Sequence, residues 1–211
     1  MSDYDPDQAR AHADLCRFLA ACYYEPGPEF VEEKLFDSML AAASQLHPDL
    51  AEHARKLGAA FAEQDLQTLL VDYARLFLGP MEAVAKPYGS SWLNAPASNA
   101  DNPPPAVLEL YSEGGFELDL EFMELPDHVA VELEFLYLLI FTKNQAKSAG
   151  DAEAAAATDS LRQRFLAEHL GAWIGPFTAA LADGAGTAFY RELALLTERF
   201  VRMESGAPMV H

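Results

Sequence analysis

One stretch of the chain, residues 126–147, constrains the fold more than any other because it is apolar on nearly every side. When its positions are spaced at 100° per residue, the apolar side chains fall on three sides rather than on one stripe. They are Phe135 and Leu139 on the first side, Val131 and Leu138 on the second, and Val129, Leu133, Leu136 and Ile140 on the third. A helix that is apolar all round lies at the centre of a protein. The sequence therefore predicts a central helix, and the proline at its first position favours a start at Pro126.

The rest of the chain is helical in pattern. Strand signals are weak, because β-branched residues are sparse, while Ala and Leu dominate and Gly and Pro gather between the periodic stretches. We predict an all-α fold, a single-domain helical bundle of about eight to ten helices, over residues 1–204, with a flexible tail at 205–211. The expected helices cover residues 7–24, 29–46, 49–63, 65–78, 106–113, 126–147, a segment ending near 170, 173–181 and 187–203.

Two segments are expected to be irregular. Residues 80–105 form a long proline-rich loop, and loops of this length in compact domains are usually functional or flexible. It carries Tyr88 and Trp92, which a plain solvated linker would not need. The Ala-rich stretch 146–159 is predicted to be a linker that leads into the next helix.

The charge of the chain limits its partners. Fourteen Lys and Arg against 33 Asp and Glu give a formal net charge of −19. So large an acidic excess argues against nucleic acid, whose phosphates need basic patches, and against an anionic membrane surface. It favours cationic partners by long-range attraction, although solubility alone is an alternative explanation.

The sequence also indicates a cytoplasmic protein. Its first ten residues, MSDYDPDQAR, are acidic and polar and do not resemble a signal peptide. No apolar run reaches the ~20 residues that a membrane span needs, so stable membrane insertion is not expected. Cys16 and Cys22 lie six residues apart on one expected helix and face different directions, so no disulfide is expected between them. Free cysteines are typical of a reducing compartment.

No motif for catalysis is found. The chain lacks a G-x-S-x-G elbow, a phosphate-binding Walker loop and a G-x-G-x-x-G fingerprint, so we expect no catalytic residues, no metal site and no cofactor. His169 is interpreted as part of a packing face. The other histidines outside residues 126–147 are interpreted as surface or turn residues, namely His12, His47, His53 and His211.

The most polar cluster falls at the start of the central helix: Glu124, Asp127, His128, Glu132 and Glu134. His128 and Glu132 are one helical turn apart and are expected to meet. Three interpretations compete. The cluster is a helix start with a His–Glu pair, or a recognition site for a cationic peptide, or a metal or acid–base site.

A second cluster precedes it in the chain. Tyr73 and Phe77 lie on a helix whose spacing favours the core. Pro87, Tyr88, Ser90 and Trp92 lie on the loop that follows. Aromatic and hydroxyl side chains beside Pro and Gly can line a groove for an extended peptide. The alternative is a loop fixed to the core by Trp92.

Taken together, these segments resemble the TorD/DmsD/NarJ family of redox-enzyme maturation chaperones. The resemblance covers most of the chain in the right order. It consists of Tyr73-x-x-Leu76-Phe77-x-Gly79-Pro80, Pro87-Tyr88-Gly89-Ser90-Ser91-Trp92-Leu93, Tyr111 to Phe116, Glu124-Leu125-Pro126-Asp127-His128 with Glu132-Leu133-Glu134-Phe135-Leu136, and Phe165 with His169-Leu170 and Trp173.

The resemblance implies a non-catalytic cytoplasmic chaperone that binds a molybdopterin oxidoreductase subunit and its twin-arginine leader peptide before export and assists cofactor insertion. It implies that Asp127 and His128, with Tyr88, Ser90 and Trp92, take part in peptide binding. The acidic side chains suit an arginine pair, which binds carboxylates through bidentate forks. The candidate peptide-binding set is therefore Tyr73, Phe77, Pro87, Tyr88, Ser90, Trp92, Glu124, Asp127, His128, Glu132 and Glu134.

Two other functions stay open at this point. One is a generic adaptor whose acidic groove binds some other basic helix. The other is a helical metal-dependent hydrolase that uses Asp127, His128 and Glu132. Some relatives exchange helices between protomers, so the chain is expected to be a monomer or a helix-exchanged dimer. If the chaperone interpretation holds, Asp127 and His128 should lie at the start of a buried helix and border a groove shared with residues 86–93.

Overall fold

The computed structural model describes residues 5–79, 83–93, 105–117 and 124–206. Within them the fold is all-α, as predicted, and no strand forms. The helices are α1 (Pro6–Cys22), α2 (Glu29–Glu32), α3 (Leu35–Leu46), α4 (Pro48–Glu63), α5 (Leu66–Tyr73), α6 (Pro105–Glu113), α7 (Val129–Ser148), α8 (Ala152–Glu168), α9 (Leu170–Gly184) and α10 (Ala188–Glu204). A π-helical turn at Ala74–Leu78 prolongs α5, and a 3-10 turn covers Gly89–Ser91.

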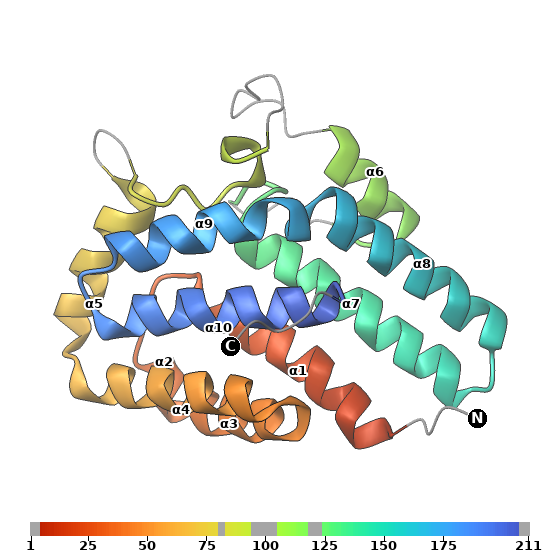
Figure 1. Ribbon diagram of the computed structural model, residues 1–211, viewed down its shortest axis with the longest axis horizontal. Helices are drawn as coiled ribbons and strands as arrows, with labels where there is room; N and C mark the ends of the chain where they lie inside the picture. The colour runs from red at the N-terminus through yellow and green to blue at the C-terminus, as the bar shows by residue number, and fades with distance from the viewer. Residues whose placement is uncertain (1–4, 80–82, 94–104, 118–123, 207–211) are drawn as a thin grey trace.

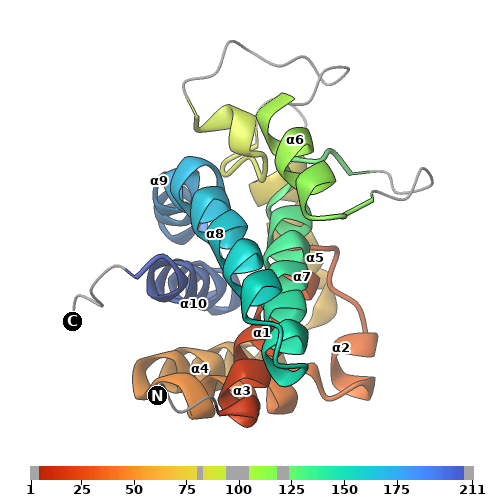
Figure 2. The ribbon, with the colours of Figure 1, turned by 90° about the vertical axis from the view of Figure 1, so that its right-hand side faces the viewer.

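The helices pack in neighbouring pairs around one apolar core. Helix α7 packs against α1 on one side and α8 on another, while α10 packs against α4 and α9 (Figures 1 and 2). The core draws side chains from nearly every helix, among them the fully buried Phe135, Phe165 and Trp173. Among the helices described, none combines the length and apolarity that a membrane crossing requires.

Helix α7 is central over its first three turns. Nine of its residues are buried, all between Val129 and Ile140. The predicted start at Pro126 is wrong, because α7 begins at Val129. His128 is the capping residue, and its ring Nδ1 accepts a hydrogen bond from the Ala130 N–H at 3.2 Å. The residues before it form a turn in which the His128 N–H donates to the Leu125 carbonyl.

The predicted helix over 29–46 is two helices. Lys34 has φ of 54°, in the left-handed region, and separates α2 from α3. Within α2, Phe30 is buried with its ring centroid 5.7 Å from that of Phe61, whereas Val31 is 64% exposed.

The predicted linker over 146–159 is much shorter. Helix α7 runs to Ser148, and α8 begins at Ala152 with Asp151 as its capping residue, whose side chain accepts from the Ala154 N–H at 2.9 Å. Gly150 makes the turn possible with φ of 75°. The acidic stretch 118–123, most of the loop at 80–82 and 94–104, and the tail at 207–211 lie outside the described residues.

Two histidines predicted at the surface are partly or fully buried beside carboxylates of α10. His53 is buried, and its Nδ1 lies 2.7 Å from Glu192 on α10. His12 is half-buried and contacts Glu204, also on α10. These partners are far away in sequence, so the helical pattern around each histidine could not reveal them.

Candidate peptide-binding site

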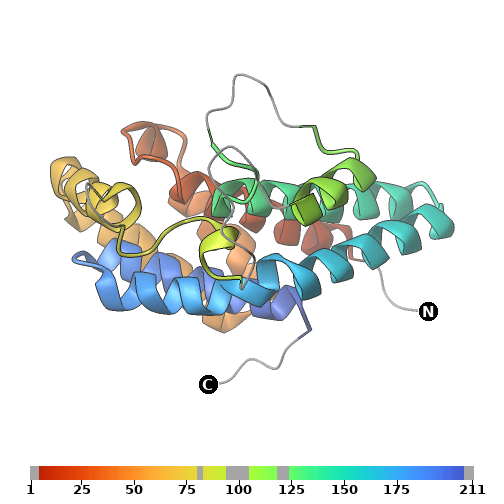
Figure 3. The ribbon, with the colours of Figure 1, turned by 90° about the horizontal axis from the view of Figure 1, so that it is seen from above.

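Residues 86–93, here called the strap, lie on the start of α7. Three hydrogen bonds join them: the Gly89 N–H to the Asp127 carbonyl at 2.8 Å, the Val129 N–H to the Pro87 carbonyl at 2.8 Å, and the Ser90 N–H to the Asp127 carboxylate at 2.9 Å. Figure 3 shows the strap between the start of α7 and α9. The segments that sequence analysis placed at one site are therefore in direct contact.

Asp127 is the residue that connects the strap to α7. Its side chain is 1% exposed, and one carboxylate oxygen accepts from Ser90. As predicted, Asp127 and His128 stand at the start of a buried helix. The groove expected between them and the strap is not seen among the described residues, because backbone hydrogen bonds join the two segments directly. What remains accessible is the outer edge of the contact, here called the rim, where Glu124 and Glu134 are partly exposed.

Glu132 lies beneath the strap and is fully buried. Its Oε2 accepts from the Trp173 Nε1–H at 3.1 Å, and its Oε1 lies 2.9 Å from His169 Nδ1 in an ion pair. Burial raises the pKa of Glu132 above its usual value, although His169 and Trp173 oppose the shift. Burial lowers the pKa of His169, but Glu132 and Asp127 outweigh it and raise the pKa overall. Glu132 and His169 are here called the base of the site.

Gly89 packs on this base so closely that a side chain has no room. A Cβ atom there would lie 3.0 Å from Trp173 Nε1 and 3.1 Å from Glu132 Oε1. Ordinary Cβ contacts are longer, so an added methyl group would push the strap outward. Glycine at this position lets the backbone of the strap rest on the buried pair.

His128 is buried beneath the rim, between two tyrosines. The Tyr24 ring stacks on it with centroids 6.1 Å apart, and the Tyr88 ring meets it edge-on at 5.4 Å. Burial lowers the pKa of His128 to about 4, so the imidazole is neutral near pH 7. That state agrees with its capping role, because Nδ1 must be unprotonated to accept from Ala130.

Two carboxylates are partly exposed on either side of His128. Glu124 accepts from the Tyr88 hydroxyl at 3.3 Å, and Glu134 accepts from the Tyr24 hydroxyl at 2.9 Å. Burial raises the pKa of Glu134. Burial, together with the nearby Glu124 charge, raises the pKa of Tyr88 to about 12, so this tyrosine keeps its proton. The rim thus presents two carboxylates, each backed by a tyrosine.

Four other predicted site residues lie away from the two rim carboxylates. Tyr73 and Phe77 are buried, with ring centroids 5.2 Å apart, and Pro87 is buried in the strap. Trp92 is half-buried; its Nε1–H donates to the Lys86 carbonyl at 2.8 Å, and its ring lies 6.2 Å from Phe177. The alternative of a loop fixed to the core by Trp92 therefore describes its contacts well.

The predicted pairing of His128 with Glu132 is wrong, because the Glu132 side chain turns inward to His169 and Trp173. Sequence analysis also missed Tyr24. Phe165, His169 and Trp173 recur every four residues, but α8 ends at Glu168 and His169 lies between α8 and α9, so this spacing did not reveal the contacts with Glu132. Tyr24 left no signal, since it reaches Glu134 across 110 positions of the chain. No group of three or more metal-ligand side chains gathers in the described residues.

Comparison with a solved structure supports the fold. The fold resembles that of a putative redox enzyme maturation protein from Archaeoglobus fulgidus, with a TM-score of 0.54 at 18% identity over 90% of this chain and 93% of that one. The likeness extends over nearly the whole of both chains and shows the fold alone.

The family follows from sequence. Residues 43–179 match the model of the nitrate reductase delta subunit family, and the chain belongs to this family. It is 28% identical over 182 residues to the chaperone protein TorD of Shewanella loihica, covering 83% of this chain and 79% of the relative. It is 29% identical over 174 residues to TorD of Aliivibrio fischeri, covering 82% and 80%. The expected family is confirmed, and its named members are chaperones rather than enzymes.

Proposed function

We propose that this chain is a cytoplasmic chaperone for a molybdopterin oxidoreductase subunit and that it binds the twin-arginine leader of that subunit. Membership of the family and the relatives named as TorD chaperones support the chaperone role. The leader site is supported by one observation. The two carboxylates at the rim, Glu124 and Glu134, each accept from a tyrosine hydroxyl on either side of His128.

This arrangement suits two neighbouring arginines. A guanidinium binds a carboxylate through two parallel N–H···O bonds and is attracted to an aromatic face. Tyr88 and Tyr24 place aromatic side chains beside Glu124 and Glu134. A lysine ammonium cannot form the same fork. The net charge of −19 attracts a cationic peptide over long range and adds to the rate of association.

Calorimetric titration with a synthetic twin-arginine leader tests the proposal. We expect micromolar or tighter binding that weakens at high salt and that falls when both arginines are replaced by lysine. Glu124→Gln and Glu134→Gln should each weaken binding by about tenfold, since each loses a charge-assisted bond.

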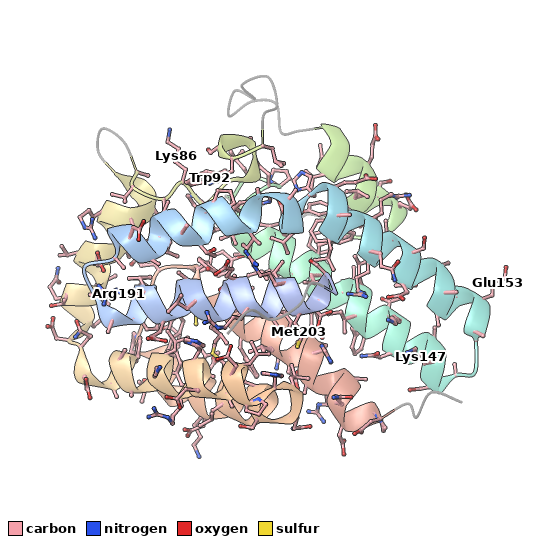
Figure 4. The ribbon with its side chains drawn as sticks, in the orientation of Figure 1. Lys86, Trp92, Lys147, Glu153, Arg191 and Met203 are labelled. Atoms are coloured by element: carbon pink, nitrogen blue, oxygen red, sulfur yellow. The ribbon has the colours of Figure 1, made fainter. Side chains whose placement is uncertain are left out.

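Glu153→Gln is the matched control. Glu153 is an exposed carboxylate in the first turn of α8, at the far end of that helix from the strap residues Lys86 and Trp92 (Figure 4). The Glu153→Gln substitution removes one negative charge, as the two rim substitutions do, but leaves the rim unchanged, so leader binding should change by less than twofold. Equal losses at all three positions would point to bulk charge, and equal binding of the lysine peptide would favour the generic acidic adaptor.

A further inference from the structure

The base of the site is a buried ion pair that lacks part of its hydrogen bonding. The side chains of Glu132 and His169 are 0% and 3% exposed, and the Nδ1 atom of His169 lies 2.9 Å from Oε1 of Glu132. Within the part of the chain that the structure describes, Nε2 of His169 has no hydrogen-bond partner. A buried ion pair often adds little net stability, because the lost hydration of both charges opposes their attraction. Stability alone is therefore a weak explanation for this pair.

The histidine lies where α8 passes into α9 (Figure 1). The Phe165 ring of α8 stacks on the imidazole of His169, with centroids 6.2 Å apart and planes 9° apart. The same imidazole faces the Glu132 carboxylate of α7, to which the Trp173 side chain of α9 donates at 3.1 Å. The position of this carboxylate thus depends on residues of α8, of α9 and of the junction between them.

The Glu132 carboxylate in turn supports the strap. A Cβ atom at Gly89 would lie 3.1 Å from Oε1 of Glu132, so the backbone of the strap rests directly on this oxygen. Tyr88 is the preceding residue of the strap, and its hydroxyl donates to the rim carboxylate of Glu124 at 3.3 Å. Because close-packed groups transmit displacements, a shift of Glu132 moves Gly89 and with it Tyr88. A continuous path of contacts therefore leads from His169 to the rim.

We propose that His169 is a positioning residue for recognition of the arginine pair. This inference rests on the proposed function and deepens it. His169 is 2% exposed beneath the strap, so it acts through Glu132 rather than by contact with the ligand. A guanidinium fork requires a narrow geometry, which the residues behind the contact surface must hold in place. A lysine ammonium is a point charge and tolerates a displaced partner. Loss of His169 should therefore reduce the preference for arginine over lysine.

Calorimetric titration of the full chain with the twin-arginine leader and with its two-lysine variant tests this role. The ratio of the two affinities is informative because it does not depend on the fraction of folded protein. His169→Phe keeps a ring of similar volume but removes the ion-pair partner of Glu132. It should lower the ratio by about tenfold, through weaker binding of the arginine peptide. His169→Gln, whose amide can donate to Glu132, should restore the ratio to within about threefold of the wild type.

Gly89→Ala tests the next contact of the same path without changing a charge. Its methyl group would push the strap away from Glu132 and Trp173, so it should also lower the ratio. This variant replaces His169→Phe if the latter does not fold.

His53→Phe is the matched control. His53 is also a buried histidine in an ion pair with a glutamate, Glu192, at 2.7 Å. This pair joins α4 to α10, and neither helix contributes to the rim, the strap or the base. His53→Phe should lower the melting temperature and leave the affinity ratio unchanged.

Two results would overturn the role of His169 alone. One is an unchanged ratio in His169→Phe and Gly89→Ala, and the other is an equal fall of the ratio in His53→Phe. Failure of the wild-type chain to prefer the arginine peptide would overturn this role together with the proposed function.

Discussion

Two buried aspartates, Asp72 and Asp127, hold loops against helix starts, but their surroundings differ. Asp72 on α5 accepts from Arg75 at 2.6 Å, from the backbone of Gly186 and Thr187 at 3.2 and 2.8 Å, and from the Thr187 hydroxyl at 2.9 Å. It thereby fixes the start of α10. Asp127 is as deeply buried, yet within the described residues it accepts from the Ser90 N–H alone.

The charges around the two residues differ in the same way. Asp72 has Arg75 as its counter-ion. Near Asp127 lies a second acid, Glu132, whose pKa the Asp127 charge raises, and His169 faces Glu132 rather than Asp127. A fully satisfied buried carboxylate contributes to stability, whereas one with spare acceptor capacity among like charges is suited to a cationic ligand. We therefore propose a stabilising role for Asp72 and a role in recognition for Asp127.

Asp72→Asn should have the largest effect. The amide keeps one acceptor oxygen, so two of the four donors face an NH2 group instead, and the counter-ion of Arg75 is lost. We expect the free energy of unfolding to fall by about 4 kcal/mol. Denaturant unfolding measures it. Leader affinity per folded molecule should stay the same, and a stability loss under 1 kcal/mol would remove the contrast between the two sites.

A change of pH should have the next largest effect, and it should act through His128 beside Asp127. Burial holds the pKa of His128 at about 4, below its usual 6.5, so its contribution to stability is fully present above pH 6.5 and is lost as pH falls through 4. The wild type should therefore lose roughly 3 kcal/mol more than His128→Gln over that window. Unfolding curves at several pH values measure this difference. Parallel curves for the two proteins would show that His128 is not held neutral.

Asp127→Asn should have the smallest effect on stability. Asparagine keeps an oxygen for the Ser90 N–H and loses only a negative charge among other acids, so unfolding should change by less than about 1 kcal/mol. Leader binding should weaken by about tenfold, which corresponds to about 1.4 kcal/mol. Paired melting and calorimetric titration resolve both numbers. A large fall in melting temperature would mean that Asp127, like Asp72, is a structural residue.

The fold could be predicted from sequence to the extent that local pattern determines it. The apolar sides of residues 126–147 identified the buried helix correctly. The start of α7 could not be predicted from Pro126, because it depends on the strap and on His128. The Val129 N–H donates to the Pro87 carbonyl of the strap, and His128 caps the first turn of the helix. Lys34 gave no sign of its left-handed backbone, since residues other than glycine rarely adopt positive φ.

The candidate site, like the fold, could be predicted only in part. Its acidic residues and the loop that meets them could be found, because charge and loop composition are visible in the chain. The partner of Glu132 could not, since His169 and Trp173 come from beyond the end of α7, 37 and 41 positions away. Local spacing instead suggested His128, which is one turn away on the same helix. Tertiary contact decided between the two.

The rim and its base are assembled from four separate parts of the chain: Tyr24 after α1, the strap, the start of α7, and Trp173 on α9. No unfolded chain can offer this combination, so a ligand bound there must favour the native state over the denatured one. At a hundred times its dissociation constant, such a ligand adds about 2.7 kcal/mol to the native state. Peptide capture and resistance to heat are therefore thermodynamically linked, and the melting temperature should rise with the concentration of any peptide that fits.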